Sequence, residues 1–323
     1  MGKRDLVLIF GGLPAVLGLL CAALYIRLDR ESETLTDGVR SKVSGSFLRL
    51  PDGVVHYELA SPSPTLLDAR TVVLIHGFSV PYYIWDPTFE ALTQPERSGN
   101  EMPFRVLRYD LYGRGYSDRP DTAYDADLYD RQLLGLLSGL GIEGPVDLVG
   151  LSMIGPIAVT FADRHPERTG KLVLVDSAYH GARRPSIWLS TPYLGEFYMT
   201  VSVAPSLPRG QLADFYDPSR FPDWPDKYRV QMQYRGFRRA LLSTLRHFAG
   251  RDVQEEYARV GKSRRPVLLV WGKADTTVPV AVTQEVLKAI PQAELHVIEE
   301  AAHLPHYERP EMVNPILMEF LRK

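Results

Sequence analysis

The sequence predicts an α/β fold in which a mostly parallel sheet is flanked by helices. Two observations support this prediction: short apolar, β-branched runs recur along the chain, and longer stretches with helical spacing separate most of them. Strands this apolar suit a sheet that is covered on both faces, and strand–helix alternation favours parallel pairing. With 323 residues, of which 45% are hydrophobic, the chain can bury a large core.

The expected elements begin with a hairpin, because Asp52-Gly53 stands between two strand-like runs. The expected strands are 46–50, 54–60, 71–75, 104–109, 146–149, 171–175, 266–271 and 294–298. The expected helices are about 127–140, 153–165, 280–290 and 310–322. The later strands are therefore predicted to be joined by helices that cross over the sheet.

This alternation stops over residues 181–258, which are rich in proline and aromatic residues and contain no sheet-like run. An insertion of this kind between two strands predicts a helical cap, or lid, over the edge of the sheet. The alternative is a pair of ordinary packing helices. We therefore expect the core of the fold in two parts, 46–180 and 259–323, with the cap between them.

The first thirty residues differ in composition from the rest. Residues 6–26 are apolar and uncharged, and about 20 such residues are enough for a helix to cross a bilayer. We expect an uncleaved, single-pass membrane anchor over residues 1–28, a polar linker over 29–45, and a membrane localisation. A cleaved signal peptide and a buried hairpin are the alternatives. The positive charges on the two sides nearly balance and favour the N-terminus inside by a small margin.

Charge and cysteine content exclude several classes of protein. The chain has 37 basic and 39 acidic residues, a net charge of −2, which gives no reason to expect a nucleic-acid partner. Cys21 is the sole cysteine, so an internal disulfide or a CxxC site cannot form. The histidines do not follow HExxH spacing. We expect neither a metal nor an organic cofactor.

Ser152 is the strongest candidate for a nucleophile. It follows the expected strand 146–149 and precedes a helical pattern, and Gly150 lets the chain turn tightly before it. A strained strand-to-helix turn exposes a serine oxygen, and the helix start supplies backbone N–H groups for a developing oxyanion. A simple helix-capping serine is the alternative interpretation of this pattern.

The segment Gly150-Leu-Ser152-Met-Ile-Gly155 resembles the nucleophile elbow of the α/β-hydrolase fold, and the resemblance extends from about Val54 to Leu321. Within these bounds, further segments resemble motifs of the family in the family's order. They are His76-Gly77-Phe78, Asp110 to Pro120, Trp271 to Pro279, and Ala302 to Glu311. In layout, the chain is similar to membrane-anchored esterases and monoacylglycerol lipases.

This resemblance implies a Ser-His-Asp triad of Ser152, His303 and Asp275, in the chain order Ser, Asp, His. Asp176 is the rival acid, since it also follows an expected strand. His306 is the rival base and is expected to be structural, and His76 is expected to shape the oxyanion loop.

The resemblance also implies that the backbone N–H groups of Phe78 and Met153 form the oxyanion hole. Ile154 departs from the family pattern, which has a small residue two positions after the serine. This isoleucine is expected to reshape the acyl pocket or to signal lost activity. The candidates for substrate contact are Phe78, Ile154, Trp188, Val278 and Leu304.

The expected reaction is hydrolysis of an apolar acyl or aryl ester through an acyl-enzyme, with monoacylglycerols among the candidate small-molecule substrates. Hydrolysis of a carbon–carbon bond in a vinylogous diketone is the alternative within enzymes. A catalytically silent protein that uses the pocket to bind a ligand is the alternative of another class, and Ile154 is the feature in its favour.

Overall fold

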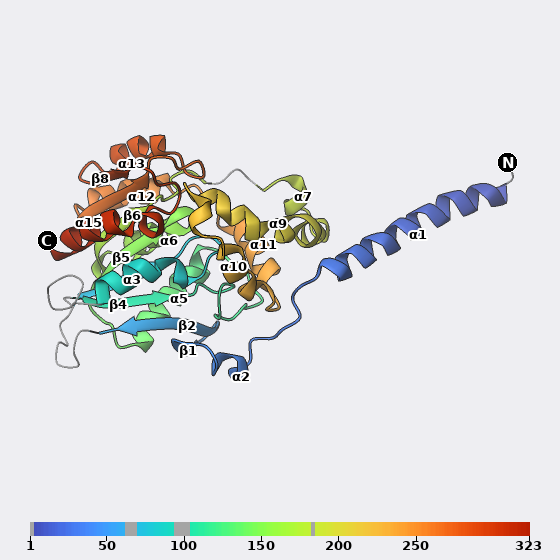
Figure 1. Ribbon diagram of the computed structural model, residues 1–323, viewed down its shortest axis with the longest axis horizontal. Coiled ribbons are helices and arrows are strands. Elements are labelled where there is room, and N and C mark those ends of the chain that lie inside the picture. Colours follow the sequence, from blue (N-terminus) through green and yellow to red (C-terminus); the bar gives the residue numbers. More distant parts are fainter. Residues whose placement is uncertain (1–2, 62–69, 94–103, 182–184) are drawn as a thin grey trace.

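A single mixed sheet organises the computed structural model of the chain (Figure 1). The structure describes residues 3–61, 70–93, 104–181 and 185–323, while the side chains of residues 3–14 and of Ile154 lie outside the described part. The strands of the sheet are β1 (Ser46–Leu50), β2 (Gly53–Ala60), β3 (Arg70–Ile75), β4 (Phe104–Tyr109), β5 (Val146–Leu151), β6 (Thr169–Val175), β7 (Val267–Gly272) and β8 (Glu294–Ile298).

The strand order is β1-β2-β4-β3-β5-β6-β7-β8. The β1–β2 and β2–β4 pairs are antiparallel, and every later pair is parallel. The predicted hairpin is confirmed, because Leu50 pairs with Gly53 across the turn. Gly53 has a φ of +146°, and a Cβ there would lie 2.7 Å from the Cβ of Asp118. The predicted mostly parallel α/β sheet is thus confirmed strand by strand.

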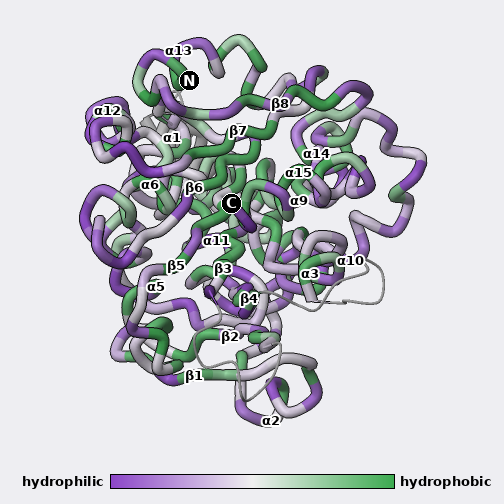
Figure 2. Tube along the Cα trace, turned by 90° about the vertical axis from the view of Figure 1, so that its left-hand side faces the viewer, coloured by the Kyte–Doolittle hydropathy of each residue, from purple (hydrophilic) through white to green (hydrophobic). Residues whose placement is uncertain are grey.

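Helices cover both faces of the sheet, because the strands carry apolar side chains on both faces. On one face, Val73 and Ile75 of β3 pack in a core with α5 (Ala126–Gly139), α6 (Gly155–Arg164), α12 (Gln254–Lys262) and α13 (Thr283–Ala289). On the other face, Val72 and Leu74 pack in a core with α3 (Asp86–Thr93) and α15 (Pro310–Arg322). Figure 2 shows this arrangement as hydrophobic strands between helices with hydrophilic outer sides.

Between β6 and β7 the described chain forms helices and turns without a strand of the sheet. The main elements are α7 (Ile187–Ser190), α8 (Leu194–Tyr198), a π-helical turn (Met199–Val203), α9 (Ala204–Gly210), the 3₁₀ turn η5 (Gln211–Asp214), α10 (Trp224–Met232) and α11 (Phe237–His247). These elements lie together at one end of the sheet (Figure 1). The expected cap boundary at residue 258 falls inside α12, which packs against α6 of the core.

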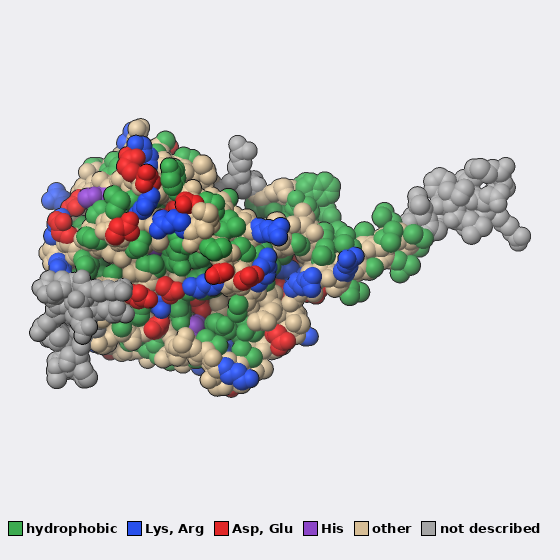
Figure 3. All heavy atoms as spheres, viewed as in Figure 1, with side chains coloured by type: hydrophobic (Ala, Val, Ile, Leu, Met, Phe, Trp, Pro, Cys, Tyr) green, Lys and Arg blue, Asp and Glu red, His purple; other side chains and the backbone are tan. Residues whose placement is uncertain are grey.

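The long N-terminal helix α1 (Lys3–Leu28) projects from the body of the molecule (Figure 1). Exposed apolar side chains lie along the described part of this helix and continue on the helices next to it (Figure 3). Within the residues that the structure describes, however, no helix is long and apolar enough to cross a membrane. This finding corrects the expected membrane anchor and membrane localisation.

The segment after α1 is held to the body by its acidic residues. Glu31 accepts hydrogen bonds from the backbone N–H of Gly236 at 2.7 Å and from Nε of Arg238 at 2.9 Å. Asp29 pairs with the same arginine at 2.7 Å, and Glu33 forms a bridge with Tyr234. The expected linker also contains a short helix, α2 (Asp37–Arg40). The side chains of Asp29 and Glu31 in the expected linker therefore contact the start of α11, while Glu33 pairs through its backbone.

Candidate active site

Ser152 lies on a sharp turn between the end of β5 and the start of α6. Its φ is +63°, a left-handed conformation that costs a non-glycine residue about 1–3 kcal/mol. The surrounding strand and helix hold the serine in this conformation, in which its Oγ atom faces His303. The local geometry is that of the strained strand-to-helix turn expected from the sequence.

Two glycines make this turn sterically feasible. A Cβ at Gly150 would lie 3.0 Å from the Cβ of Ala158, and a Cβ at Gly155 would lie 2.1 Å from Oγ of Ser177. Gly155 therefore provides the close packing that the family pattern assigns to the position before it. The side chain of Ile154 lies outside the described residues, so the expected effect of this isoleucine on the pocket stays a prediction.

The structure brings the three expected triad residues into one hydrogen-bonded line. The Oγ atom of Ser152 lies 2.6 Å from Nε2 of His303, and Nδ1 of His303 lies 2.8 Å from Oδ2 of Asp275. All three residues are buried, with exposed fractions of 7%, 4% and 5% respectively. A carboxylate at Nδ1 selects the tautomer that leaves Nε2 free to accept the serine proton.

Asp275 is oriented by the backbone that follows β7. Its Oδ1 atom accepts hydrogen bonds from the N–H groups of Thr277 at 2.7 Å and Val278 at 2.9 Å. Its other oxygen, Oδ2, is left for the imidazole. Asp275 rather than the rival Asp176 is thus the carboxylate in hydrogen-bond contact with His303.

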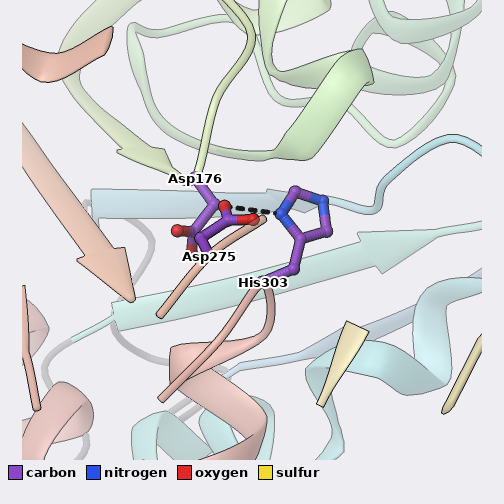
Figure 4. Close-up of side chains that lie close together, drawn as sticks. All are labelled: Asp176, Asp275 and His303. Atoms are coloured by element: carbon purple, nitrogen blue, oxygen red, sulfur yellow. Dashed lines mark hydrogen bonds and ion pairs between the residues drawn. The ribbon is translucent and has the colours of Figure 1, made fainter. Parts of the chain in front are cut away.

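Asp176 also lies at this site, at the end of β6, and it is fully buried. Figure 4 shows its side chain next to that of Asp275, on the same side of the imidazole. Its Oδ1 atom accepts a hydrogen bond from the N–H of Gly272 at 2.9 Å. Burial, and next the negative charge of Asp275, raise the pKa of Asp176 well above its usual value. Sequence reasoning had treated this residue only as a competitor of Asp275.

The loop after β3 carries the expected oxyanion donor Phe78. Phe78 and the second expected donor, Met153, both line the cavity in front of Ser152. His76 supports this loop: its Nδ1 lies 2.7 Å from the carbonyl oxygen of Gly77, and its Nε2 accepts the N–H of Leu111 at 2.9 Å. Burial lowers the pKa of His76 to about 4, so a neutral ring shapes the loop.

Arg114, from the Asp110 to Pro120 motif, is a fully buried residue that sequence reasoning did not single out. Its Nε donates to the carbonyl oxygen of Phe78 at 2.8 Å, and its Nη2 donates to Oγ1 of Thr244 at 3.0 Å. Thr244 belongs to α11, so the guanidinium connects the oxyanion loop to the helices between β6 and β7. The rigidity of the site therefore depends on a residue remote from the triad in sequence.

A cavity of about 120 Å³ lies in front of the serine. Besides Ser152, His303 and the loop residues, it is lined by Gln211 and Asp214 of η5 and by Thr277. Oδ1 of Asp214 accepts from Oγ1 of Thr277 at 3.0 Å, and burial raises the pKa of this carboxyl. Among the described lining residues there is no lysine or arginine. No motif in the sequence points to these cap residues, since only folding brings η5 next to the serine.

The expected substrate contacts are divided between the cavity and other surfaces. Phe78 and Leu304 line the cavity. Trp188 is 56% exposed on α7, because the short helix turns it outward. Val278 packs against the core beside β7 and accepts a hydrogen bond from Nε1 of Trp271 at 2.8 Å. Neither Trp188 nor Val278 is among the residues that line the cavity.

His306, the rival base, is buried away from the serine. Its Nε2 lies 3.2 Å from the carbonyl oxygen of Ile84, and its ring packs against Trp85 with the ring centroids 4.2 Å apart. Burial lowers the pKa of His306 to about 3. A neutral, structural histidine is therefore found here, as the sequence predicted.

A nucleophile elbow, a strand-end acid and a loop histidine on a mostly parallel sheet define the class of α/β hydrolases. The chain matches the alpha/beta hydrolase family over residues 72–316 and belongs to it. It is therefore identified as a hydrolase of this superfamily, as the sequence motifs predicted.

Individual relatives carry more specific names. A 2-hydroxy-6-oxononadienedioate/2-hydroxy-6-oxononatrienedioate hydrolase of Cupriavidus pinatubonensis is 30% identical over 284 residues, covering 85% of this chain and 94% of that protein. A protein of the same name from Burkholderia vietnamiensis is 34% identical over 227 residues, covering 68% of this chain and 77% of that protein. Among solved structures, an enol-lactonase from Burkholderia xenovorans LB400 has a TM-score of 0.72 at 23% identity, covering 86% of this chain and 100% of its own.

Proposed function

We propose that this chain is a serine hydrolase that cleaves a carbon–carbon bond next to a ketone in a vinylogous diketone. The similarity to 2-hydroxy-6-oxo-dienedioate hydrolases over 85% of the chain carries this proposal. The line from Ser152 through His303 to Asp275 supplies the groups that such a reaction needs. Ester hydrolysis, the first expectation from the sequence, becomes the second candidate.

In the proposed mechanism, Nε2 of His303 takes the proton of Ser152 Oγ as that oxygen attacks the substrate ketone. The N–H groups of Phe78 and Met153 stabilise the oxyanion. When the carbon–carbon bond breaks, its electron pair passes through the conjugated enone to the oxygen of the second ketone. The imidazolium of His303 returns its proton to the resulting dienolate, which leaves as a dienol. Water then attacks the acyl-serine with His303 as base, while Asp275 stabilises the charged ring.

The charge of the cavity restricts the substrate. The dienedioates in the relatives' names carry a carboxylate at each end. Here Asp214 lines the cavity, and no lysine or arginine does so among the described residues. A substrate carboxylate entering beside Asp214 would lose its water without gaining a cationic partner among these residues, which is costly in a partly desolvated site. We therefore expect a dienoate whose acyl end is uncharged.

The same observation favours the second candidate, hydrolysis of an apolar carboxylic ester, since both reactions place an uncharged acyl group beside Ser152. The cavity of about 120 Å³ is smaller than the roughly 300–1,000 Å³ of typical ligand sites. Either substrate would require η5, which carries Gln211 and Asp214, to move outward.

Three substrate groups test the proposal: 2-hydroxy-6-oxo-dienoates with 6-methyl or 6-phenyl ends, the corresponding dienedioate, and 4-nitrophenyl esters of varied acyl length. We expect the highest kcat/KM for the uncharged 6-substituted dienoates, and no turnover by Ser152→Ala. Turnover of the esters alone would replace the proposal by the second candidate. A folded wild-type protein that fails to react with a fluorophosphonate would overturn both and favour a ligand-binding role.

A further inference from the structure

The acid side of the candidate site contains two buried carboxyl groups rather than one. Atoms of Asp176, Asp275 and His303 that could act as ligands all lie within 4.8 Å of one another (Figure 4). Two neighbouring carboxylates out of contact with water do not both ionise, because their mutual repulsion is poorly screened. One of the two is therefore expected to keep a proton.

The hydrogen-bond donors show which carboxyl carries the charge. Asp275 accepts three N–H groups, from Thr277, Val278 and the His303 ring. Asp176 accepts one, from Gly272. Hydrogen bonds donated to a carboxylate stabilise its charged form. The negative charge thus belongs on Asp275, and the proton on Asp176.

The charges around Asp176 favour the same assignment. The titratable groups that face it are Asp275, Glu308 of α14 (Pro305–Glu308) and the His303 ring, and Asp214 faces the same histidine and Asp275. Apart from His303 when it is protonated, none of these is a cation. Burial and the charge of Asp275 accordingly raise the pKa of Asp176.

The free oxygen of Asp176 completes the argument. Its Oδ2 atom is buried and lacks a hydrogen-bond partner among the described groups when both carboxyls are treated as acceptors. A carboxylate offers about four acceptor sites, and three of those on Asp275 are used by the N–H groups above. A proton on Oδ2 of Asp176 would satisfy both this buried oxygen and the remaining site of Asp275.

We propose that Asp176 is a positioning residue that stays protonated and donates a hydrogen bond through Oδ2 to Asp275. Its other oxygen accepts from Gly272, which fixes the carboxyl group to β7. The φ of +43° at Asp176, unfavourable for a residue with a Cβ, holds the side chain toward Asp275. The carboxylic acid thus orients Asp275 toward His303 and limits how strongly that carboxylate holds the imidazolium proton.

The test uses the pH dependence of fluorophosphonate labelling at Ser152, which requires no knowledge of the substrate and is independent of the proposed carbon–carbon cleavage. Asp176→Asn keeps an acceptor for Gly272 and a donor for Asp275. We expect this variant to label within a fewfold of wild type, with the acidic limb of its pH profile unmoved. Asp176→Ala removes the hydrogen-bond donor to Asp275. The labelling rate of this variant is expected to fall by about ten- to hundredfold, and its loss of labelling at low pH should begin at a higher pH than in wild type.

Asp147→Asn is the matched control, since Asp147 is a buried aspartate at the other end of the sheet, paired with Arg70. Its labelling profile should keep the wild-type limb. An infrared difference spectrum of wild type against Asp176→Asn should contain the C=O band of one protonated carboxylic acid.

Two results would overturn the proposal. If Asp176 is ionised, Asp176→Asn removes a negative charge beside His303, and the acidic limb moves to lower pH, without a carboxylic-acid band in the spectrum. If the cluster instead binds a metal ion, EDTA abolishes labelling of the wild type. Failure of every dienoate and ester as a substrate would overturn the proposed function but leave the labelling test intact.

Discussion

The described part of the chain contains two buried His–Asp pairs of nearly equal geometry, and one of them faces a nucleophile. His303 lies 2.8 Å from Asp275, and His56 lies 2.7 Å from Asp110. Both rings are almost fully buried. A larger cavity, about 440 Å³, lies beside His56, so neither the pair itself nor the size of the neighbouring space distinguishes a reactive centre.

The difference lies at the second nitrogen of each ring. Nε2 of His303 faces the hydroxyl of Ser152, from which it can accept a proton. Nε2 of His56 lies 2.8 Å from the carbonyl oxygen of Ser44, which can only accept. With Asp110 at Nδ1, both nitrogens of His56 must donate, so the ring is a cation that clamps the loop before β1. A base requires a free acceptor nitrogen, and of these two histidines it is His303 that has one.

This comparison is tested most strongly by replacing each acid. Asp275→Asn should lower fluorophosphonate labelling and turnover by about 10,000-fold, because the asparagine stabilises the wrong tautomer of His303. Asp110→Asn should weaken folding while Ser152 of the folded fraction stays reactive. Labelling rates, normalised to the folded fraction from circular dichroism, measure both. Equal losses of reactivity in the two variants would contradict the distinction between the pairs.

The pair of His56 and Asp110 should contribute strongly to the free energy of unfolding. His56→Gln removes a cation that is hydrogen-bonded on both sides and leaves Asp110 buried, so the free energy of unfolding should fall by about 3 kcal/mol. His165→Gln is the control, since His165 forms a more exposed pair with Asp130 at 3.1 Å and should lose less than about 1 kcal/mol. Urea denaturation measures both, and equal losses would show that the His56 pair is not a clamp.

The close packing at the turn around Ser152 can be tested with a steric change. Gly155→Ala places a Cβ 2.1 Å from Oγ of Ser177 and should destabilise the protein by about 1–3 kcal/mol, with slower labelling of Ser152. Adding Ser177→Gly should restore part of both losses. Gly38→Ala is the control, because its nearest neighbour, Oγ1 of Thr36, is 3.7 Å away. If the single elbow variant resembles this control, close packing does not govern the turn.

The smallest expected effect is a pH dependence of stability. Burial opposes a charge on His56, but the hydrogen bond and charge of Asp110 and the carbonyl of Ser44 raise its pKa overall. The stabilisation by the His56 charge is therefore complete below the unfolded histidine pKa of about 6.5 and is lost as the pH rises through the higher folded value.

The partner titrates in the opposite sense. Burial alone would raise the pKa of Asp110, but the hydrogen bond and charge of His56 lower it overall. Its contribution is present above the unfolded aspartate pKa of about 3.9 and is lost as the pH falls through the folded value. The stability advantage of wild type over His56→Gln should thus be greatest between the two unfolded pKa values, about 3.9 and 6.5, and should shrink as the pH rises above the higher one. An advantage that grows with pH would show that His56 is neutral.

Most of the sheet could be predicted from the sequence because each strand contains several apolar residues, and β3, β5 and β7 are almost continuous apolar runs. The helix at Asp86–Thr93 was not predicted, since its apolar residues follow no long pattern and pack only after the chain folds. The N-terminal apolar run was interpreted as a membrane span, which the described helices do not support. Ser152, His303 and Asp275 could be placed because each follows a strand in a family motif.

The sequence by itself determined where the strands lie along the chain and which residues follow them, because apolar periodicity and short turn motifs are local properties of the chain. Only the tertiary structure decided that Asp275 rather than Asp176 contacts His303, that Asp214 lines the cavity, and that His56 is a clamp. Most of these contacts join segments that are far apart in the sequence, such as His56 and Asp110 at a separation of 54 residues. Their chemistry depends on which nitrogen or oxygen faces which partner. Burial then sets the charge of each group, and burial is a property of the folded chain as a whole.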